Sequence, residues 1–413
     1  MHLLWLKTDL LHPIDKGGKI RTYQMLRELR RRHHVTYLAL DDGTAARDAL
    51  ERAEEYCHEL IPVPHRSPAK LTPAFFFDLV ANLRSSLPYA VEKYRSETFR
   101  RHVEHLQKRV DLIVCDFLFP SVNLPARLEK PSVLFQHNVE AQIWHRHAET
   151  RRGRFVEAYF RAQWRRMRDY ERETCRRFDA VVAVSSQDRA IMETEYDAPV
   201  VREVPTGVDT EYFTPSGQAE PDPYHLVFTG SMDWLPNDDA MKYFLREILP
   251  LIRQALPAVT LTIVGRNPLP GLRALCRNDN GIRLTGLVAD VRPFMEDASV
   301  YVVPLRIGGG TRLKVFEAMA MERPIVSTTV GVEGLPVSDG SDVLLADDPR
   351  RFAEAVVRLL KDPALAVRVG RAGGAKVRAQ FGWSAAAHAF EETCHLALER
   401  TASGNMNTVL VRG

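Results

Sequence analysis

Short runs of apolar residues alternate along the chain with longer stretches in which apolar residues recur at helical spacing. Buried strands and amphipathic helices have these two patterns. Strands are predicted near Leu3–Leu6, Val35–Leu40, Leu112–Cys115, Ser132–Gln136 and Ala180–Val184, and then near Leu226–Thr229, Leu261–Val264, Ile282–Leu284, Val300–Val303 and Pro324–Ser327. Because strands that alternate with helices form parallel sheets with crossover helices, the pattern predicts an α/β chain built from doubly wound sheets.

A proline-marked passage from Pro199 to Pro223 interrupts this alternation and predicts the boundary between two domains. The interpretation is an N-terminal Rossmann-like domain over 1–204, a hinge over 205–223 and a second Rossmann-like domain over 224–380. The end of the chain, 401–413, has no apolar pattern and is predicted to be a mobile tail. Ligands of doubly wound sheets bind beyond the carboxyl ends of the strands, so the loops there are expected to meet at one cleft.

A glycine-rich turn follows the predicted strand Val300–Val303. Leu313, Phe316 and Ala320 then recur at helical spacing, which places the turn at the start of a helix. The turn contains Gly308, Gly309, Gly310 and Thr311. Glycine lets the backbone approach an anion closely, and a helix N-terminus directs amide groups and about half a positive charge toward it.

Charged side chains at this turn favour phosphate as the ligand. Arg312 has a planar fork that matches phosphate oxygens, and Lys314 adds a compact positive charge. Glu317, one helical turn further on, is placed to accept hydrogen bonds from ribose hydroxyls. A glycine trio alone indicates only a turn with solvated charges, and the added Arg, Lys and Glu reverse that interpretation. The sequence therefore predicts a cradle for a nucleoside diphosphate, with the amides from Gly310 to Leu313 around the anion.

Composition excludes several other classes of protein. The 56 Lys and Arg residues against 53 Asp and Glu residues leave a net charge of +3, which provides no field for holding nucleic acid. The five cysteines are scattered and form no C-x-x-C pair, so neither a disulfide framework nor a zinc site is expected. No apolar run has the character of a signal-peptide core or the length of a membrane span. A cytoplasmic protein is expected.

Several motifs recur in the order and spacing typical of one enzyme family. They are the turn from Pro13 to Gly18, the segment Phe178–Ser185, the hinge motif Val204–Pro215, the strand Leu261–Gly265, and Glu317–Ala320 followed by Arg323–Ser327. On these residues the chain resembles the retaining glycosyltransferases of the GT-B fold, known as glycosyl transferases group 1, family 4. Its Gly-Thr-Arg-Leu-Lys loop, 310–314, is similar to the donor loop of one subgroup.

The resemblance implies a fold, a reaction and a set of ligands. Two Rossmann-like domains would face a central cleft, and a helix over 381–400 would cross back to the first domain. The implied reaction moves a sugar, with retention of its anomeric configuration, from a nucleotide-diphosphate sugar to a glycan or lipid-linked acceptor of cell-envelope or exopolysaccharide biosynthesis. UDP is preferred over GDP on the resemblance alone. No Asp-x-Asp motif is present, so no metal or other cofactor is expected, and Arg312 and Lys314 must stabilise the leaving diphosphate.

Two positions depart from the family pattern. The family commonly has two glutamates around the donor loop, and Glu317 matches the second whereas Gly309 occupies the place of the first. The family also often places cations after the first strand of the second domain, but Gly230 is followed here by Ser231 and no cation comes with 234–237. Arg312 and Lys314 are expected to replace that charge.

Further candidate site residues lie in the first domain. His137 follows the strand Ser132–Gln136, at a family position that faces the donor sugar. It is expected to hydrogen-bond a sugar hydroxyl or the leaving phosphate, or to move a proton near neutral pH. Asn138 shares this strand end, and Glu140 is a candidate for contact with the acceptor.

Glycines mark two more candidate positions. Gly17 and Gly18 form an early turn that the resemblance places at the cleft, where the backbone could approach the diphosphate or the acceptor. Whether Arg21 adds charge there is left open. Gly265 ends a strand of the second domain, where the family's backbone surrounds the nucleotide base.

Two surface segments and two other functions stay open. The basic aromatic stretch 151–178 is interpreted as a packing helix, with peripheral contact of its arginines with the cytoplasmic face of the inner membrane as an alternative. The run Phe75–Val80 fits a core helix as well as an entry for a hydrophobic acceptor. A nucleotide-sugar epimerase on the same fold and a non-catalytic partner that binds sugar nucleotide remain as alternative functions.

Overall fold

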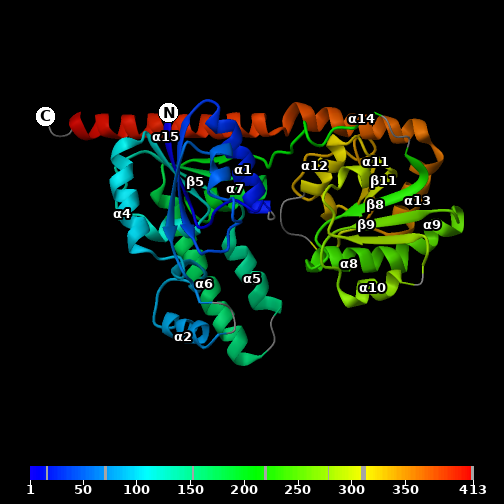
Figure 1. The fold of residues 1–413 in the computed structure, drawn as a ribbon, viewed down its shortest axis with the longest axis horizontal. Helices are drawn as coiled ribbons and strands as arrows, with labels where there is room; N and C mark the ends of the chain where they lie inside the picture. The colour runs from blue at the N-terminus through cyan, green and yellow to red at the C-terminus, as the bar shows by residue number, and fades with distance from the viewer. Residues whose placement is uncertain are drawn as a thin grey trace. The chain divides into compact units, whose positions relative to one another are not determined.

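The chain folds into two units, each with its own sheet and helices (Figure 1). The computed structural model describes residues 1–14, 17–68, 72–150, 153–217, 221–277, 279–307 and 313–410. The first unit comprises Met1–Pro205 and Ala386–Gly413, and the second comprises Thr206–Ala385. Both sheets are parallel and have helices between their strands, so the prediction of two doubly wound domains is confirmed.

In the described part of the first unit, seven parallel strands form the sheet in the order β3-β2-β1-β4-β5-β6-β7. They are β1 (His2–Lys7), β2 (His34–Asp41), β3 (Glu59–Pro64), β4 (Leu112–Asp116), β5 (Ser132–Phe135), β6 (Ala180–Ala183) and β7 (Val201–Glu203). The apolar pattern predicted all of these except β3 and β7, which are the two edge strands. Strand β3 contains two prolines, which an edge strand tolerates because its outward N–H groups need no partner.

In the described part of the second unit, six parallel strands follow the order β10-β9-β8-β11-β12-β13. They are β8 (Asp222–Thr229), β9 (Thr260–Val264), β10 (Ile282–Gly286), β11 (Ala298–Val303), β12 (Ile325–Ser327) and β13 (Leu344–Leu345). Only the short edge strand β13 was not predicted. The chain order reverses between β1 and β4 in the first sheet and between β8 and β11 in the second, and such switch points are where doubly wound sheets bind ligands.

Helices connect the strands. In the first unit they are α1 (Gly17–Arg30), α2 (Pro73–Asn82), α3 (Tyr89–Glu92), α4 (Glu97–Leu106), α5 (Glu140–Thr150), α6 (Arg154–Arg177) and α7 (Ser186–Thr194). In the second they are α8 (Leu235–Tyr243), α9 (Leu249–Ala255), α10 (Pro270–Cys276), α11 (Arg292–Glu296), α12 (Leu313–Ala320), α13 (Pro349–Lys361) and α14 (Pro363–Gln380). Short 3₁₀ or π turns occur at Glu51–Glu55, Gln107–Arg109, Phe119–Asn123, Phe244–Ile248 and Val330–Val332.

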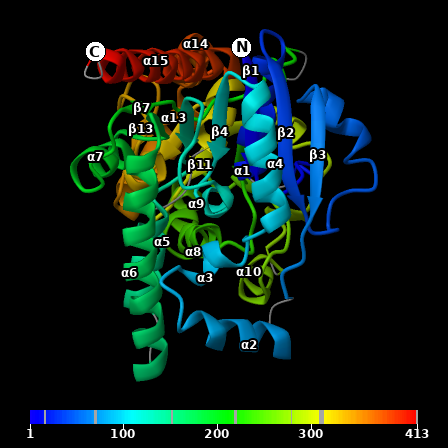
Figure 2. The ribbon, with the colours of Figure 1, turned by 90° about the vertical axis from the view of Figure 1, so that its left-hand side faces the viewer.

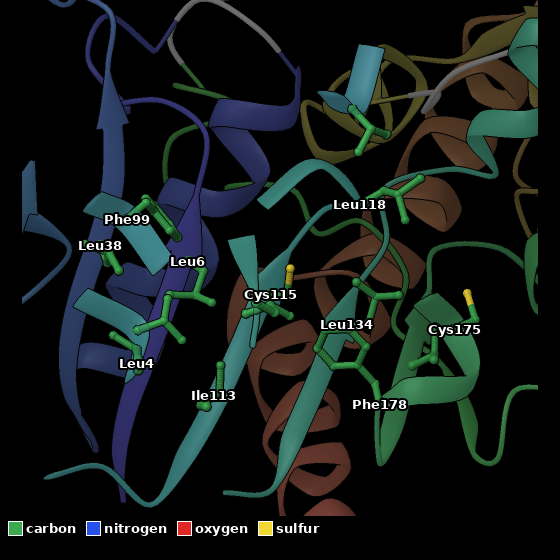
Figure 3. Close-up of a cluster of buried hydrophobic side chains, with 14 of the residues drawn as sticks. Leu4, Leu6, Leu38, Phe99, Ile113, Cys115, Leu118, Leu134, Cys175 and Phe178 are labelled. Carbon is green, nitrogen blue, oxygen red and sulfur yellow. The ribbon is translucent and has the colours of Figure 1, made fainter. Parts of the chain in front are cut away.

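The core of the first unit lies on both faces of its sheet. Figure 3 shows Leu4 and Leu6 of β1, Ile113 of β4 and Leu134 of β5 in one buried cluster with Phe99 of α4. Strands β1, β4 and β5 are apolar between their polar end residues because both faces of a doubly wound sheet are covered by helices. Burial of each such side chain contributes about 1.5–3 kcal/mol.

The last helix, α15 (Trp383–Leu410), begins in the second unit and belongs to the first from Ala386 onward. Its Phe390 packs against Trp5 with ring centroids 5.4 Å apart and against Phe135 at 5.2 Å. The predicted tail, 401–413, lies largely outside the residues whose side chains are described. Among the described helices, none combines the length and the apolar composition that crossing a bilayer requires.

Helix α14 packs closely against the segment after α12, so a methyl group added at their contact should destabilise the fold. A Cβ atom at Gly370 would overlap the carbonyl oxygen of Glu322. Gly370→Ala should therefore lower the free energy of unfolding by about 1–3 kcal/mol, measured by denaturant titration. The control is Gly271→Ala in α10, where the new methyl group meets only the end of the Lys242 side chain. Equal stability of both variants would contradict this account of the packing.

Candidate functional site

The switch point of the first unit brings three polar side chains together. Lys7 is the last residue of β1, Asp116 is the last residue of β4, and His137 follows β5. These strands are neighbours in the sheet, so their carboxyl ends meet at one edge. Lys7 and Asp116 are missing from the sequence-based candidates, although each is a charged residue that ends an apolar strand.

Asp116 is the centre of this cluster and is fully buried. Its Oδ1 atom accepts hydrogen bonds from Lys7 Nζ and His137 Nε2, each at 2.7 Å. Its Oδ2 atom accepts hydrogen bonds from Trp5 Nε1 at 2.7 Å and Thr22 Oγ1 at 2.6 Å. Burial alone would raise the pKa of Asp116, but the Lys7 ammonium and His137 outweigh it and hold the pKa below its usual range. The carboxylate is therefore ionised.

His137 is held as a neutral imidazole. Burial and the nearby Lys7 ammonium lower the pKa of His137 to about 4 in spite of Asp116. With its Nε2–H donated to Asp116, the Nδ1 atom is left as an acceptor. A Cβ atom at Gly18 would lie 3.5 Å from Nδ1, so the ring faces the start of α1. The low pKa argues against the hypothesis that His137 moves a proton near neutral pH and favours a role as a hydrogen-bond acceptor.

Helix α1 begins at Gly17 and Gly18, beside the imidazole. Arg21 is buried, and its guanidinium lies 5.7 Å from the ring centroid of Phe135. Burial lowers the pKa of Arg21 to about 9, with Asp116 opposing the shift. The side chain is therefore still positively charged at neutral pH.

A second buried acidic side chain supports the loop that carries His137. Glu171 of α6 accepts hydrogen bonds from the backbone N–H groups of Glu140 at 2.9 Å and Ala141 at 3.0 Å. It also accepts hydrogen bonds from Gln136 Nε2 and Tyr196 Oη. The first turn of a helix has N–H groups without partners inside the helix, and Glu171 satisfies two of them at the start of α5. No local sequence pattern pointed to Glu171, which lies about 30 residues along the chain from the groups it binds.

Glu140 and Asn138 lie within this supported loop. Glu140 is buried, and burial raises its pKa to about 7, while a hydrogen bond from Asn138 opposes the shift. Burial likewise raises the pKa of Glu171 to about 8 against its two backbone donors. Since Glu140 is buried, its carboxyl group is not presented to an acceptor in this structure.

In the second unit, two glycines follow the neighbouring strands β8 and β9 at their carboxyl ends. Gly230 follows β8 with φ of 153°, and Gly265 follows β9. A Cβ atom at Gly265 would overlap the carbonyl oxygen of Gly230. The two backbone segments can approach this closely because Gly265 has no side chain, and a Cβ atom at Gly230 would instead overlap Asn237 Nδ2 and Lys314 Nζ.

Lys314 lies beside this pair of glycines. It is the second residue of α12, and its Nζ donates a hydrogen bond to Asn237 Oδ1 at 2.7 Å. The same ammonium lies 4.2 Å from the ring centroid of Phe228 in β8. Glu317, one turn further along α12, is half-buried; burial raises its pKa to about 7, with Lys314 opposing. Leu313 begins the helix.

The rest of the glycine-rich turn cannot be placed in this geometry. Gly308, Gly309, Gly310, Thr311 and Arg312 lie outside the described residues. The predicted anion cradle is therefore described only from its helical side, at Leu313, Lys314 and Glu317.

Arg266 is a cation that the sequence analysis did not identify. It follows Gly265 directly, and its Nε donates a hydrogen bond to Ser231 Oγ at 3.1 Å. Its side chain is about one third exposed. The turn after β8 brings no cation of its own, as expected, yet Arg266 from the neighbouring strand and Lys314 both reach it. Its position directly after Gly265, the glycine that follows β9, was the sequence feature that could have identified Arg266.

The described side chains at the two switch points do not resemble a metal site. In the described ranges, no group of three His, Cys, Asp or Glu side chains is arranged to hold a metal ion. At the first switch point the Asp116 carboxylate is already occupied by Lys7 and His137, and at the second the side chains that reach the turn after β8 are the cations Lys314 and Arg266. Such a donor set suits anionic ligands more than a divalent cation.

Two family models match consecutive parts of the chain. Residues 16–212 match the family described as Glycosyltransferase Family 4, and residues 223–362 match the family described as Glycosyl transferases group 1. A lipopolysaccharide core biosynthesis mannosyltransferase of Rhizobium leguminosarum bv. viciae is 26% identical over 53% of this chain and 65% of its own length. Matches to the first curated relatives span between 37% and 65% of their lengths.

Solved structures share the whole architecture. Sucrose-phosphate synthase from Thermosynechococcus elongatus has a TM-score of 0.69 at 19% identity, over 95% of this chain and 98% of its own. Anabaena Alr3699/HepE in complex with UDP has a TM-score of 0.64 at 14% identity, over 95% of this chain and 99% of its own. These likenesses confirm the predicted GT-B fold class.

The buried ion pair of the first unit predicts a pH-dependent loss of stability. Asp116→Asn leaves the Lys7 ammonium buried without a counter-ion, which should lower the free energy of unfolding by about 3–5 kcal/mol at pH 7. The native pKa of Asp116 is depressed, so its contribution is complete above an unfolded-state pKa of about 3.9 and is lost as the pH falls through the lower native value. The stabilities of wild type and variant should therefore converge in acid.

The control for this prediction is Asp111→Asn. Asp111 is exposed at the other end of the same strand and accepts a hydrogen bond from the backbone N–H of His2. Denaturant titration should show a change within about 1 kcal/mol. A similar loss for both variants would show that burial of the Lys7–Asp116 pair is not what matters.

Proposed function

We infer that this chain, in which two glycosyltransferase family models match side by side on a GT-B fold, transfers a sugar from a nucleotide-diphosphate donor to an acceptor. One observation carries the proposal: Lys314 and Arg266 approach the turn after β8 from two different elements. Two cations at the carboxyl end of a switch-point strand suit a diphosphate. The second unit is therefore the proposed donor-binding unit.

The proposed role of Lys314 is to stabilise the leaving diphosphate. Its ammonium is already oriented by Asn237, so little reorganisation is needed when negative charge develops on the departing phosphate. It also lies in the first turn of α12, where backbone amides favour an anion. Arg312 is proposed to add a bidentate contact from the preceding turn. Because these cations can supply the charge, we propose that transfer needs no metal ion.

The proposed role of the first unit is to hold the acceptor and one edge of the donor sugar. His137 is fixed as a neutral acceptor, which suits a hydrogen bond from a sugar hydroxyl. We further propose that the sugar keeps its anomeric configuration, as the family resemblance implies. The departing phosphate is then the base for the acceptor hydroxyl, because His137 is too weak a base at neutral pH.

The substrate classes follow from the relatives. UDP rather than GDP is proposed as the donor nucleotide because the resemblance implies it, and the Anabaena neighbour is a complex with UDP. The Rhizobium relative acts in lipopolysaccharide core biosynthesis, which supports a glycan or lipid-linked acceptor of the cell envelope. The transferred group is proposed to be a hexose.

Kinetics of site variants test this proposal. Lys314→Ala and Arg312→Ala should each lower kcat/KM for the donor by roughly 100-fold or more, because each removes charge stabilisation of the leaving group. The assay is nucleoside-diphosphate release from UDP-, GDP-, ADP- and dTDP-sugars, with and without lipid-linked acceptors. Arg253→Ala, which removes an arginine paired with Asp279 in the same unit, is the control and should change little.

The outcomes of this assay are distinct. Wild-type kinetics in both variants would rule out the proposed leaving-group role. Conversion of the donor into a second nucleotide sugar without acceptor would indicate an epimerase. Nucleotide binding without turnover across the panel would favour a non-catalytic binding partner, the hypothesis raised by Gly309.

Glu317 makes the donor affinity depend on pH. Its pKa is raised to about 7, so the carboxyl group is largely protonated at pH 6 and ionised at pH 8. If the carboxylate accepts hydrogen bonds from ribose, KM for the donor should fall several-fold as the pH rises from about 6 to 8. Glu317→Gln should have a higher KM at pH 8 and little dependence on pH, measured by initial rates at each pH. An unchanged slope in the variant would assign the titration to another group.

A further inference from the structure

Helix α2 has its apolar side facing outward. Phe76, Phe77, Val80 and Leu83 follow one another at helical spacing, and their side chains are 52%, 73%, 65% and 57% exposed. The polar residues of the helix, Asp78 and Asn82, lie on the opposite side and are half-buried and buried. An ordinary surface helix has the reverse arrangement, with apolar residues toward the core.

Polar contacts fix the helix in this orientation. Asn82 accepts a hydrogen bond from Gln163 Nε2 at 2.8 Å, and its backbone carbonyl accepts one from Arg166 Nη1 at 2.8 Å. Arg166 Nη2 also donates to the carbonyl of Leu83 at 3.0 Å. Both donors belong to α6, and Figure 2 shows α2 beside the lower part of that helix, below the sheet of the first unit. These hydrogen bonds hold the polar side of α2 against α6. The apolar side therefore faces outward, and no described residue of the chain covers it.

The exposed charges in the chain segment that carries this face are positive. Among the described residues from 72 to 95, the exposed charged side chains are Arg84 and Arg95, while the acids Asp78 and Glu92 are not exposed. Glu92 is turned inward to Asn82 and Ser85.

We propose that the face formed by Phe76, Phe77, Val80 and Leu83 inserts into an anionic lipid bilayer. The face is the convex side of a single helix, not a groove, and none of its side chains can form a hydrogen bond. A surface of this kind suits insertion into the apolar layer of a bilayer, which offers no specific partner groups. Arg84, which follows Leu83 directly and is exposed, complements anionic headgroups. The inference goes beyond transfer activity and does not depend on it. Of the two sequence-based alternatives for Phe75–Val80, a core helix and an entry for a hydrophobic acceptor, the core helix does not fit, because Phe76, Phe77 and Val80 are exposed.

Vesicle co-sedimentation with the full chain tests this proposal. Wild type should bind vesicles of phosphatidylcholine with phosphatidylglycerol, and bind vesicles of phosphatidylcholine alone less tightly. The double variant Phe76→Ser/Phe77→Ser should bind the anionic vesicles at least about tenfold more weakly, because two apolar anchors are lost. Arg84→Glu should weaken binding mainly at low ionic strength, since exposed charges are screened by salt.

A control variant and a second measurement separate a loss of membrane binding from a loss of folding. Val367→Ser replaces a half-exposed apolar residue of α14 in the other unit and should bind vesicles as wild type does. In Phe77→Trp, tryptophan emission should shift to shorter wavelength when anionic vesicles are added.

Several results would overturn the proposal. They are absence of wild-type binding, equal binding by the double variant, equal binding to neutral vesicles, and an unshifted emission in Phe77→Trp. Self-association of wild type that the double variant abolishes, without vesicle binding, would instead assign the face to contact between two copies of the chain.

Discussion

The ionised carboxylate of Asp116 is the constraint on which the site of the first unit depends. A buried anion is stable only when hydrogen-bond donors and a counter-ion replace the water it has lost. Here the donors come from β1, from α1 and from the loop after β5, with Lys7 as the counter-ion. The positions of these three elements are therefore coupled, because a shift of any one would leave a buried charge without a partner.

The backbone next to Asp116 is consistent with this constraint. Phe117 has φ of 77°, a conformation that costs a non-glycine residue about 1–3 kcal/mol. Its N–H donates to the carbonyl of Phe135 at 2.8 Å, and its ring lies 5.3 Å from that of His137. Together with Glu171, which holds the start of α5, these contacts fix the imidazole before any ligand binds. A fixed acceptor is what orientation of a sugar hydroxyl requires.

The second unit assembles its site differently, through the absence of side chains. Gly230 and Gly265 let the turns after β8 and β9 touch, which leaves room for cations that come from elsewhere. Lys314 reaches the turn from α12 and Arg266 from the residue after β9. The same turn therefore receives positive charge without containing a cation itself, and this charge is the basis of the proposed diphosphate site.

The apolar pattern of the chain was enough to predict the two doubly wound sheets and the switch-point loops, because buried parallel strands are apolar between their ends and the polar residues that follow stand out. The sequence also identified His137, Lys314 and Glu317 as candidates from the local order of residues. It did not reveal that Asp116 joins Lys7 to His137, that Glu171 caps α5, or that Arg266 serves the turn after β8. These contacts join residues far apart in the chain, so no local pattern encodes them. The protonation state of His137 and the outward face of α2 were likewise decided by tertiary structure, since burial and neighbouring charges set a pKa and packing alone decides which side of a helix is covered.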